Sequence, residues 1–277
     1  MQHLQLATRI TPSDPHCNRW IPRATKLARN MLIGGDMSDT ARRRPTIPLE
    51  RMPLDQALAC VDPFETAVPE ELARLVASAT CSTRKQGAVV LRQGEAPDGV
   101  YVVLRGRVHL VSNLGGDREL ILFSLGPGEI FGESCAFDDR EMTLSALVAV
   151  QAHLVKIPVS AVRAWVGERP EVLGRFARLV HDRLRDAEAV ASGLALCDVE
   201  QRLRKTLARL VARQGRRAVT CEGWVLAPVP TQTELARMVG SCRETVSRTL
   251  SAFAREGLLS ARGRRLVLSD QFLAGAT

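Results

Sequence analysis

The chain has 277 residues, enough for two domains with apolar cores, and its 38 Lys and Arg exceed its 30 Asp and Glu by a net charge of +8. No run of 18 or more apolar residues occurs, and the first residues lack the order of a secretory signal, so we expect a cytoplasmic protein without a membrane span. The seven cysteines include no Cys-x-x-Cys pair, which argues against a zinc ribbon or a local iron–sulfur cluster.

Positive charge is concentrated at the C-terminal end. Residues 199–277 contain 14 Lys and Arg against 6 Asp and Glu, whereas residues 51–198 contain 16 against 20. An uneven basic balance of this kind indicates a polyanionic partner for the C-terminal part.

The first 50 residues predict a disordered N-terminal extension, because several prolines interrupt them and no periodic apolar pattern is present. The true translation start stays open among Met1, Met31, Met37 and Met52.

Residues 51–169 predict a β-rich domain with flanking helices. Residues 69–79 form a short helix beginning at Pro69, and short apolar runs punctuated by glycines follow. The runs are Ala88–Leu91, Val100–Leu104, Val108–Val111, Leu120–Leu125, Leu144–Val150 and Leu154–Ile157, with a hairpin tip at Asn113–Asp117. Their number and spacing favour a small antiparallel sandwich or roll.

Residues 170–197 predict one long helix with a heptad pattern. Leu173, Val180, Ala187 and Leu194 recur every seven residues, with Phe176 and Val190 on the neighbouring seam. The pattern favours a homodimer over packing within a single chain, although Arg183 occupies one position of the apolar seam.

Residues 198–277 predict a winged helix-turn-helix. A helix over 199–213 and a short hairpin over 218–226 precede two short helices, which join at the turn Gly240-Ser241. A strand that starts at 257–259, a basic turn and a strand over 266–268 then form a wing.

The second helix of the motif carries the base-reading chemistry. Arg243 and Arg248 can each donate two hydrogen bonds to guanine, and Glu244 can accept one from cytosine N4, so this helix is expected to read double-stranded DNA in the major groove. The expected contacts to the DNA backbone come from Thr231, Ser241, Ser247, Arg262, Arg264 and Arg265.

Three motifs together resemble the CRP/FNR family of bacterial transcription regulators, over roughly residues 64–270. Gly94–Gly106 and Phe131–Ser134 resemble the two cyclic-nucleotide-binding signatures, and Gly240–Arg248 is similar to the recognition helix of the cyclic-AMP receptor branch. The resemblance implies an α+β fold: a cyclic-nucleotide-binding-like β-roll, a long dimerisation helix and a winged helix-turn-helix. It also implies a homodimer on a palindromic TGTGA-like operator, with RNA polymerase as a partner.

The effector cassette departs from the cyclic-AMP-binding pattern. Gly132 and Glu133 are present, but Met142-Thr143 stand where those members have an Arg-Ser pair, and Ala187 and Glu188 replace their adenine-contacting Thr-Ser. Methionine offers a phosphate neither charge nor a hydrogen-bond donor, so Gly132, Glu133, Met142 and Thr143 predict a degenerate effector site that disfavours cyclic AMP.

Other sensor chemistries and functions are less well supported. Only Cys17 lies in the first 50 residues, so an N-terminal iron–sulfur site is not expected, and His109 and His153 on predicted strands favour structural roles over haem ligation. The alternative function is a small-molecule-binding module whose output is not DNA. No catalytic motif points to an enzyme.

Overall fold

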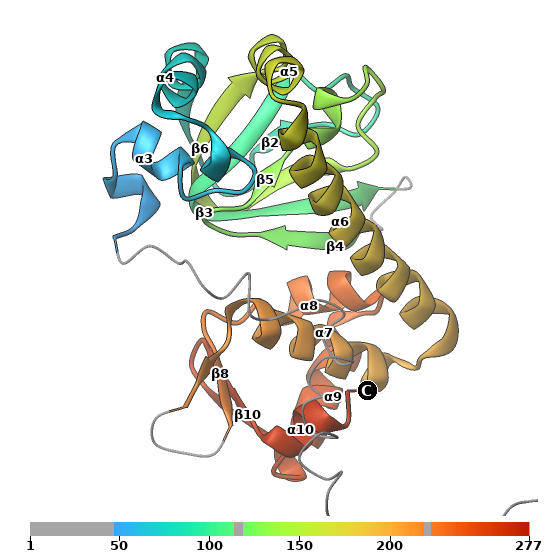
Figure 1. The fold of residues 1–277 in the computed structure, drawn as a ribbon. Helices are drawn as coiled ribbons and strands as arrows, with labels where there is room; N and C mark the ends of the chain where they lie inside the picture. The colour runs from blue at the N-terminus through green and yellow to red at the C-terminus, as the bar shows by residue number, and fades with distance from the viewer. Residues whose placement is uncertain (1–46, 114–118, 219–222, 277) are drawn as a thin grey trace, which may run out of the picture. The chain divides into compact units, whose positions relative to one another are not determined.

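The computed structural model describes residues 47–113, 119–218 and 223–276 (Figure 1). Most of the expected N-terminal extension, and residues 114–117 of the expected hairpin tip, lie outside the described residues. The helices are α3 (Leu54–Leu58), α4 (Pro69–Ser78), α5 (Val159–Glu168), α6 (Pro170–Leu196), α7 (Val199–Gln214), α8 (Gln232–Val239), α9 (Arg243–Arg255) and α10 (Asp270–Ala274), with short 3-10 helices at Leu49–Arg51, Phe64–Thr66 and Glu133–Ala136.

The strands form two antiparallel sheets. The first has the order β1-β6-β3-β4, with β2 paired to β6 and β5 paired to β3; the second has the order β7-β8-β10-β9. Their bounds are β1 Thr80–Arg84, β2 Val89–Leu91, β3 Gly99–Asn113, β4 Glu119–Leu125, β5 Ile130–Phe131, β6 Ser145–Pro158, β7 Arg216–Arg217, β8 Trp224–Leu226, β9 Leu259–Arg262 and β10 Arg265–Leu268.

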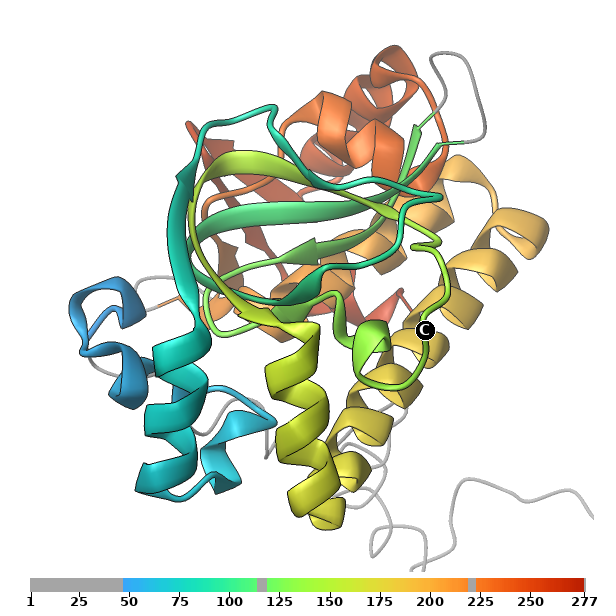
Figure 2. The same ribbon diagram turned by 90° about the horizontal axis from the view of Figure 1, so that it is seen from above.

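The first sheet curls into the expected roll (Figure 2), but two pairs of expected strands are single strands. The runs at 100–104 and 108–111 belong to β3, and the run at 154–157 belongs to β6 together with all of the run at 144–150 except its first residue. Gly106 explains part of this continuity: its φ is +90°, and a Cβ there would lie 2.2 Å from the Gln151 carbonyl oxygen. Glycine therefore lets β3 and β6 stay paired through shifts of register that a short-range sequence pattern interprets as breaks.

One end of the roll is covered by α4 and α5 (Figure 1). Phe64 and Trp165 stack there with ring centroids 5.4 Å apart, in the same apolar cluster as Phe176 of α6. Leu49 is also buried in this cluster.

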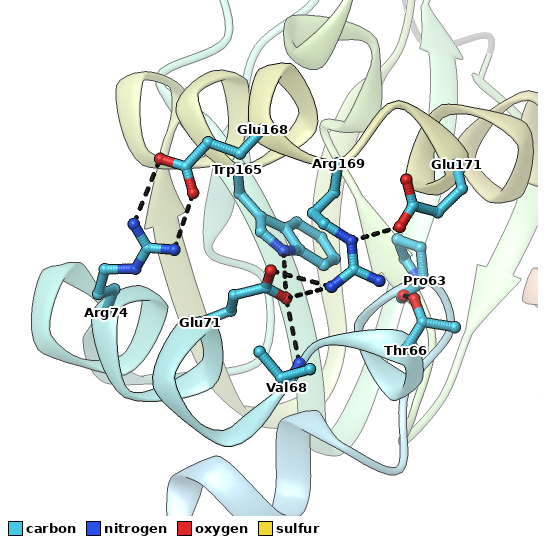
Figure 3. A network of polar contacts seen from close by, with 9 residues as sticks. All are labelled: Pro63, Thr66, Val68, Glu71, Arg74, Trp165, Glu168, Arg169 and Glu171. Carbon is cyan, nitrogen blue, oxygen red and sulfur yellow. Dashed lines mark hydrogen bonds and ion pairs between the residues drawn. The ribbon is translucent and has the colours of Figure 1, made fainter.

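A buried carboxylate joins α4 to the segment between α5 and α6 (Figure 3). Glu71 accepts hydrogen bonds from Trp165 Nε1 at 3.1 Å, Arg169 Nη1 at 3.0 Å and the Val68 amide at 3.1 Å. Burial raises the pKa of Glu71, but these donors outweigh burial and hold the pKa below its usual value. The network fixes the start of α6, because Arg169 precedes the first residue of that helix.

The apolar residues of the long helix α6 do not form the single exposed seam that was expected, because some of them are buried. Phe176 and Val190 are buried against their own chain, and Ala187 packs against the cluster inside the roll, so these three residues do not belong to an exposed dimer seam. A separate exposed row remains and consists of Leu173, Val180, Leu184 and Leu194, each 39–54% exposed.

The C-terminal domain packs α7, α8, α9 and α10 with the second sheet. Its core includes Leu203, Leu207 and Phe253, and the Asp198 carboxylate caps α7 by accepting from the Gln201 amide at 2.8 Å. The helix α10, which the sequence pattern did not predict, contributes Phe272. The Arg204 guanidinium lies 5.2 Å from the Phe272 ring centroid.

Candidate DNA interface

The N-terminus of α8 is held by a capping box. The Thr231 hydroxyl accepts from the Glu234 amide at 3.2 Å, and the Glu234 carboxylate accepts from the Thr231 amide at 2.7 Å. The other carboxylate oxygen lies 3.1 Å from Nε2 of the buried His109. The contact with His109, together with the hydrogen bonds from Thr231, lowers the pKa of Glu234 to about 2. His109 therefore has a carboxylate partner, as the expected structural role requires, while phosphate contact by Thr231 stays a prediction.

The turn between α8 and α9 depends on Gly240. Its φ of +61° lies in the left-handed region that glycine adopts without strain, and the Ser241 amide donates to the Ala236 carbonyl at 3.0 Å to close α8. Leu235 of α8 and Val246 of α9 are buried in one cluster, which fixes the two helices against each other. The turn residues expected from the sequence therefore form a helix-turn-helix.

The exposed surface of α9 carries the expected base-reading residues, while Val246 and Phe253 are buried in the core. Arg243, Glu244 and Arg248 are all exposed, and Glu244 and Arg248 lie four residues apart, one helical turn. Arg248 Nη2 lies 3.4 Å from the Thr245 hydroxyl. No carboxylate in the described part of the chain forms a salt bridge with Arg243 or Arg248, so both guanidinium groups have free donors for an external acceptor.

Glu244 is ionised at neutral pH and can act only as an acceptor. Its pKa is lowered, first by the hydrogen bond from its own backbone amide at the start of α9 and then by Cys242, with Arg243 and Arg248 adding smaller contributions. An ionised carboxylate between two arginines suits an amino-group donor such as cytosine N4.

The wing is a tight antiparallel pair of β9 and β10. Arg265 pairs with Arg262, and Gly263 between them has a φ of +59°. Arg262, Arg264 and Arg265 are exposed, and the Arg264 carbonyl accepts from the Val229 amide at 3.1 Å. Three cations on one short turn form a surface suited to phosphate groups.

The expected effector residues come together only in part. Gly132 has a φ of +78°, and a Cβ there would lie 2.5 Å from the Gly99 carbonyl oxygen, so the backbone alone requires glycine. Glu133 is buried, Met142 is 9% exposed within the apolar cluster of the roll, and Thr143 is exposed. Arg140 does not replace the missing cation, since its side chain is 90% exposed and pairs with Asp138.

Arg183 also departs from the position expected for it. It does not lie on an exposed dimer seam; its side chain turns toward the roll, where Nη1 lies 2.5 Å from Glu133 Oε1. The heptad pattern located it on the helix without showing that its partner is in the same chain.

Other chemistry in the described residues is limited. No group of three His, Cys, Asp or Glu side chains there is arranged to hold a metal ion, and none of the described helices is long and apolar enough to cross a membrane. Cys60, Cys81, Cys135, Cys197 and Cys242 are free thiols. Burial raises the pKa of Cys135 to about 11, which makes it an unreactive thiol.

Two protein-family models match the chain. The cyclic nucleotide-binding domain matches residues 83–169, and the Crp-like helix-turn-helix domain matches residues 201–271. The first match spans most of the roll and α5, and the second spans the domain that contains α8 and α9.

Characterised relatives match across both domains. The chain is 32% identical over 219 residues to a CRP-like cAMP-activated global transcriptional regulator of Mycobacterium tuberculosis, covering 78% of this chain and 96% of that protein. It is 31% identical to a cyclic AMP receptor protein of Thermus thermophilus, covering 71% and 87%. The solved structure of the c-di-GMP-responsive regulator CLP of Xanthomonas campestris is similar with a TM-score of 0.62 at 28% identity, over 73% of this chain and 99% of that one. The protein therefore belongs to the CRP/FNR family of transcription regulators, with a cyclic-nucleotide-binding-like roll and a DNA-binding helix-turn-helix domain.

Proposed function

We propose that the protein acts as a homodimer that binds a palindromic operator with TGTGA-like half-sites and regulates transcription with RNA polymerase as its partner. The observation that carries the proposal is the exposed face of α9, where Arg243, Glu244 and Arg248 lie without a competing salt bridge from the described residues. Two arginines and one carboxylate match two guanines and one cytosine in each half-site.

The homodimer is supported by the exposed row of α6. Leu173, Val180 and Leu184 recur at intervals of seven and four residues, so they follow one stripe of the helix, and Leu194 lies at its edge. An apolar stripe of this length is stabilised by a matching stripe from a second copy. A two-fold pair would present two α9 helices to half-sites about one DNA turn apart, roughly 34 Å.

The wing and the helix-turn-helix define the second part of the interface. Arg262, Arg264 and Arg265 are placed to meet phosphates, and Thr231, Ser241 and Ser247 supply hydroxyl groups along the same motif. These residues are proposed to set affinity and register, while the α9 face sets the sequence.

Signal control belongs to the roll in this proposal. The Mycobacterium relative is a cAMP-activated regulator and the Xanthomonas relative is c-di-GMP-responsive, so related regulators respond to different nucleotides. A binding module without DNA output is the second candidate function, but the presence of the helix-turn-helix favours the regulator.

The test is binding of the purified protein to DNA duplexes that carry TGTGA and TCACA arms at one-turn spacing, against duplexes with scrambled arms. We expect at least about 100-fold preference for the palindrome at about 150 mM salt, with a stoichiometry of two chains per duplex. Equal affinity for the scrambled duplex would contradict the operator assignment, and one chain per duplex would contradict the dimer.

A further inference from the structure

Strand β3 of the roll is covered on both of its faces. Val108 and Leu110 belong to the apolar cluster inside the roll, whereas Val111 is buried in the core cluster of the DNA-binding domain. His109 also faces outward, since its Nε2 lies 3.1 Å from the Glu234 carboxylate of α8. Alternate residues of a strand point to opposite sides of a sheet, so the outer side of β3 is packed against α8 of the same chain.

The contact of β3 and β4 with α8 has an apolar centre, and together they form a joint between the roll and the DNA-binding domain. Val111 of β3 and Ile121 of β4 are buried in one cluster with Leu235 and Met238 of α8. These four side chains are only 1–7% exposed. The joint therefore connects the two domains directly, in addition to the covalent connection through α6 and α7.

The polar centre of the joint is the contact between His109 and Glu234. His109 is 2% exposed, and the Glu234 carboxylate is ionised at neutral pH, because its pKa is about 2. An ionised carboxylate can only accept, so His109 Nε2 carries the proton and donates a charge-assisted hydrogen bond. The same carboxylate closes the N-terminus of α8 by accepting from the Thr231 amide at 2.7 Å, so one side chain both caps α8 and joins it to the roll.

Two further polar contacts belong to the joint. Arg237 Nη1 of α8 lies 2.9 Å from Glu119 Oε2 of β4, and Arg107 Nη2 of β3 donates at 3.0 Å to Oε1 of Gln214, the last residue of α7. Hydrogen bonds are directional, so these contacts, with that of His109, fix the orientation of α8 as well as its distance from the sheet.

The orientation of α8 sets that of α9. Leu235 and Val246 hold the two helices against each other in one core, while Arg243, Glu244 and Arg248 take no part in the joint and stay exposed. A dimer on a palindrome must present both of its α9 helices at the same time. Helices that are oriented before DNA arrives lose less conformational freedom on binding, which strengthens the complex.

We propose that His109 latches α8 to the roll, so that the roll fixes the orientation in which α9 meets DNA. This inference rests on the proposed function and deepens it, because it names a direct connection between the roll and the reading helix. His109 and Glu119 lie on the roll and outside the proposed DNA interface, so their substitution removes no proposed DNA contact.

The experiment compares the full-length wild type with H109E, H109Q and the control T83E. H109E places a second carboxylate against Glu234, whereas H109Q keeps a hydrogen-bond donor within reach of it. T83E adds the same charge at an exposed position of β1, a strand that pairs with β6 and not with β3 or β4. Amide hydrogen exchange of α8 is measured without DNA, and affinity is measured for palindromic and scrambled duplexes.

We expect the α8 amides to exchange at least about tenfold faster in H109E than in T83E, because repulsion replaces a charge-assisted hydrogen bond. Palindrome affinity should be at least about tenfold weaker in H109E than in T83E, because α9 is no longer oriented before binding. Affinity for scrambled DNA should agree within about threefold, since non-specific binding depends mainly on charge. H109Q should stay within about threefold of the wild type in all three measurements.

A second pair of variants covers the case in which H109E unfolds the roll, which the exchange of the β6 amides would reveal. E119R places two cations against each other at a partly exposed position, where Glu119 is 29% exposed, and E119R/R237E restores an opposite pair. E119R should speed the exchange of α8 and weaken palindrome binding about threefold or more. The double variant should return the exchange of α8 to within about twofold of the wild type.

Slow exchange of α8 in both H109E and E119R, equal to that in T83E, would overturn the inference. So would faster exchange of α8 combined with unchanged or tighter palindrome binding, because the roll would then not orient α9 for DNA. If the wild type does not prefer the palindrome, the proposed operator fails, and the exchange of α8 without DNA still decides whether His109 latches α8 to the roll.

Discussion

The exposed surface of α9 and the contact between α6 and the roll differ in how their arginine side chains are partnered. Arg243 and Arg248 are exposed and form no salt bridge with a described carboxylate, whereas Arg183 is mostly buried and fully engaged with Glu133 and Ile130. An exposed guanidinium is solvated by water, so its charge costs little free energy, and its free donors are available to DNA. A buried one must be paired within the chain. Charge on the DNA-binding domain is therefore available to a partner, while charge inside the roll stabilises the chain.

The largest effect is expected from breaking the proposed homodimer. Leu184→Asp places a charge in the centre of the exposed α6 row, where Leu184 is 54% exposed, so the single chain should stay folded while the pair dissociates. We expect at least about 100-fold weaker palindrome binding, measured beside mass by light scattering. Glu188→Asp, an exposed change on the same helix, is the control; a dimeric L184D would disprove the assigned stripe.

The next effect separates base reading from general charge. Arg243→Ala should weaken palindrome binding by about 1–3 kcal/mol and relax the preference at one base pair, because one bidentate guanine contact is lost. Arg255→Ala removes an exposed arginine from the last turn of the same helix and serves as the control. Titrations against duplexes altered at single base pairs measure both the loss of affinity and the change in base preference. An equal loss on palindromic and scrambled DNA would assign Arg243 to the phosphates.

The third test concerns the interior of the β-roll domain. Glu71→Gln should lower the free energy of unfolding by about 2–3 kcal/mol near neutral pH without changing DNA affinity per folded dimer. The folded pKa of Glu71 is lowered, so its contribution is present above the ordinary Glu pKa and is lost as pH falls through the folded value. The free energy of unfolding, measured with urea between about pH 3 and 7, should therefore fall less steeply with decreasing pH in E71Q than in the wild type. If the free energies of unfolding of E71Q and the wild type had the same pH dependence, Glu71 would not contribute to stability as an ionised hydrogen-bond acceptor.

The smallest effect is expected at the wing. Arg264→Gln should weaken binding only a few-fold, equally on palindromic and scrambled DNA, and should lower the slope of log affinity against log salt by about 1. Arg217→Gln is a suitable comparison, because Arg217 is already paired with Asp270 at 3.1 Å. A loss confined to the palindrome would show that the wing reads bases.

Local signals in the sequence were sufficient for most helices and for the DNA-binding motif. Pro69, Thr231 and Gly240 mark helix ends through backbone chemistry that acts over a few residues, so α4, α8 and the turn before α9 could be predicted from the sequence. The family resemblance rested on the same short motifs, and the comparisons confirm it.

Longer-range features were harder to predict. The interruptions within β3 and β6 were interpreted as strand ends, because the pairing that carries both strands through Gly106 comes from residues more than 40 positions apart. The role of Phe176 was misplaced for a similar reason: a heptad shows which residues share a helix stripe and does not show whether that stripe meets another chain or the same chain.

The sequence by itself determined the family and the order of the domains, and it supplied the residues that we propose to read bases, because these depend on composition and on contacts between near neighbours. Only the tertiary structure decided what Arg183, Glu71 and Glu234 do, since each is defined by a partner far away in the chain. A charged side chain has the same appearance in a sequence whether it is solvated or buried. Its burial and its partner, which set the free energy of that charge, arise only when the chain folds.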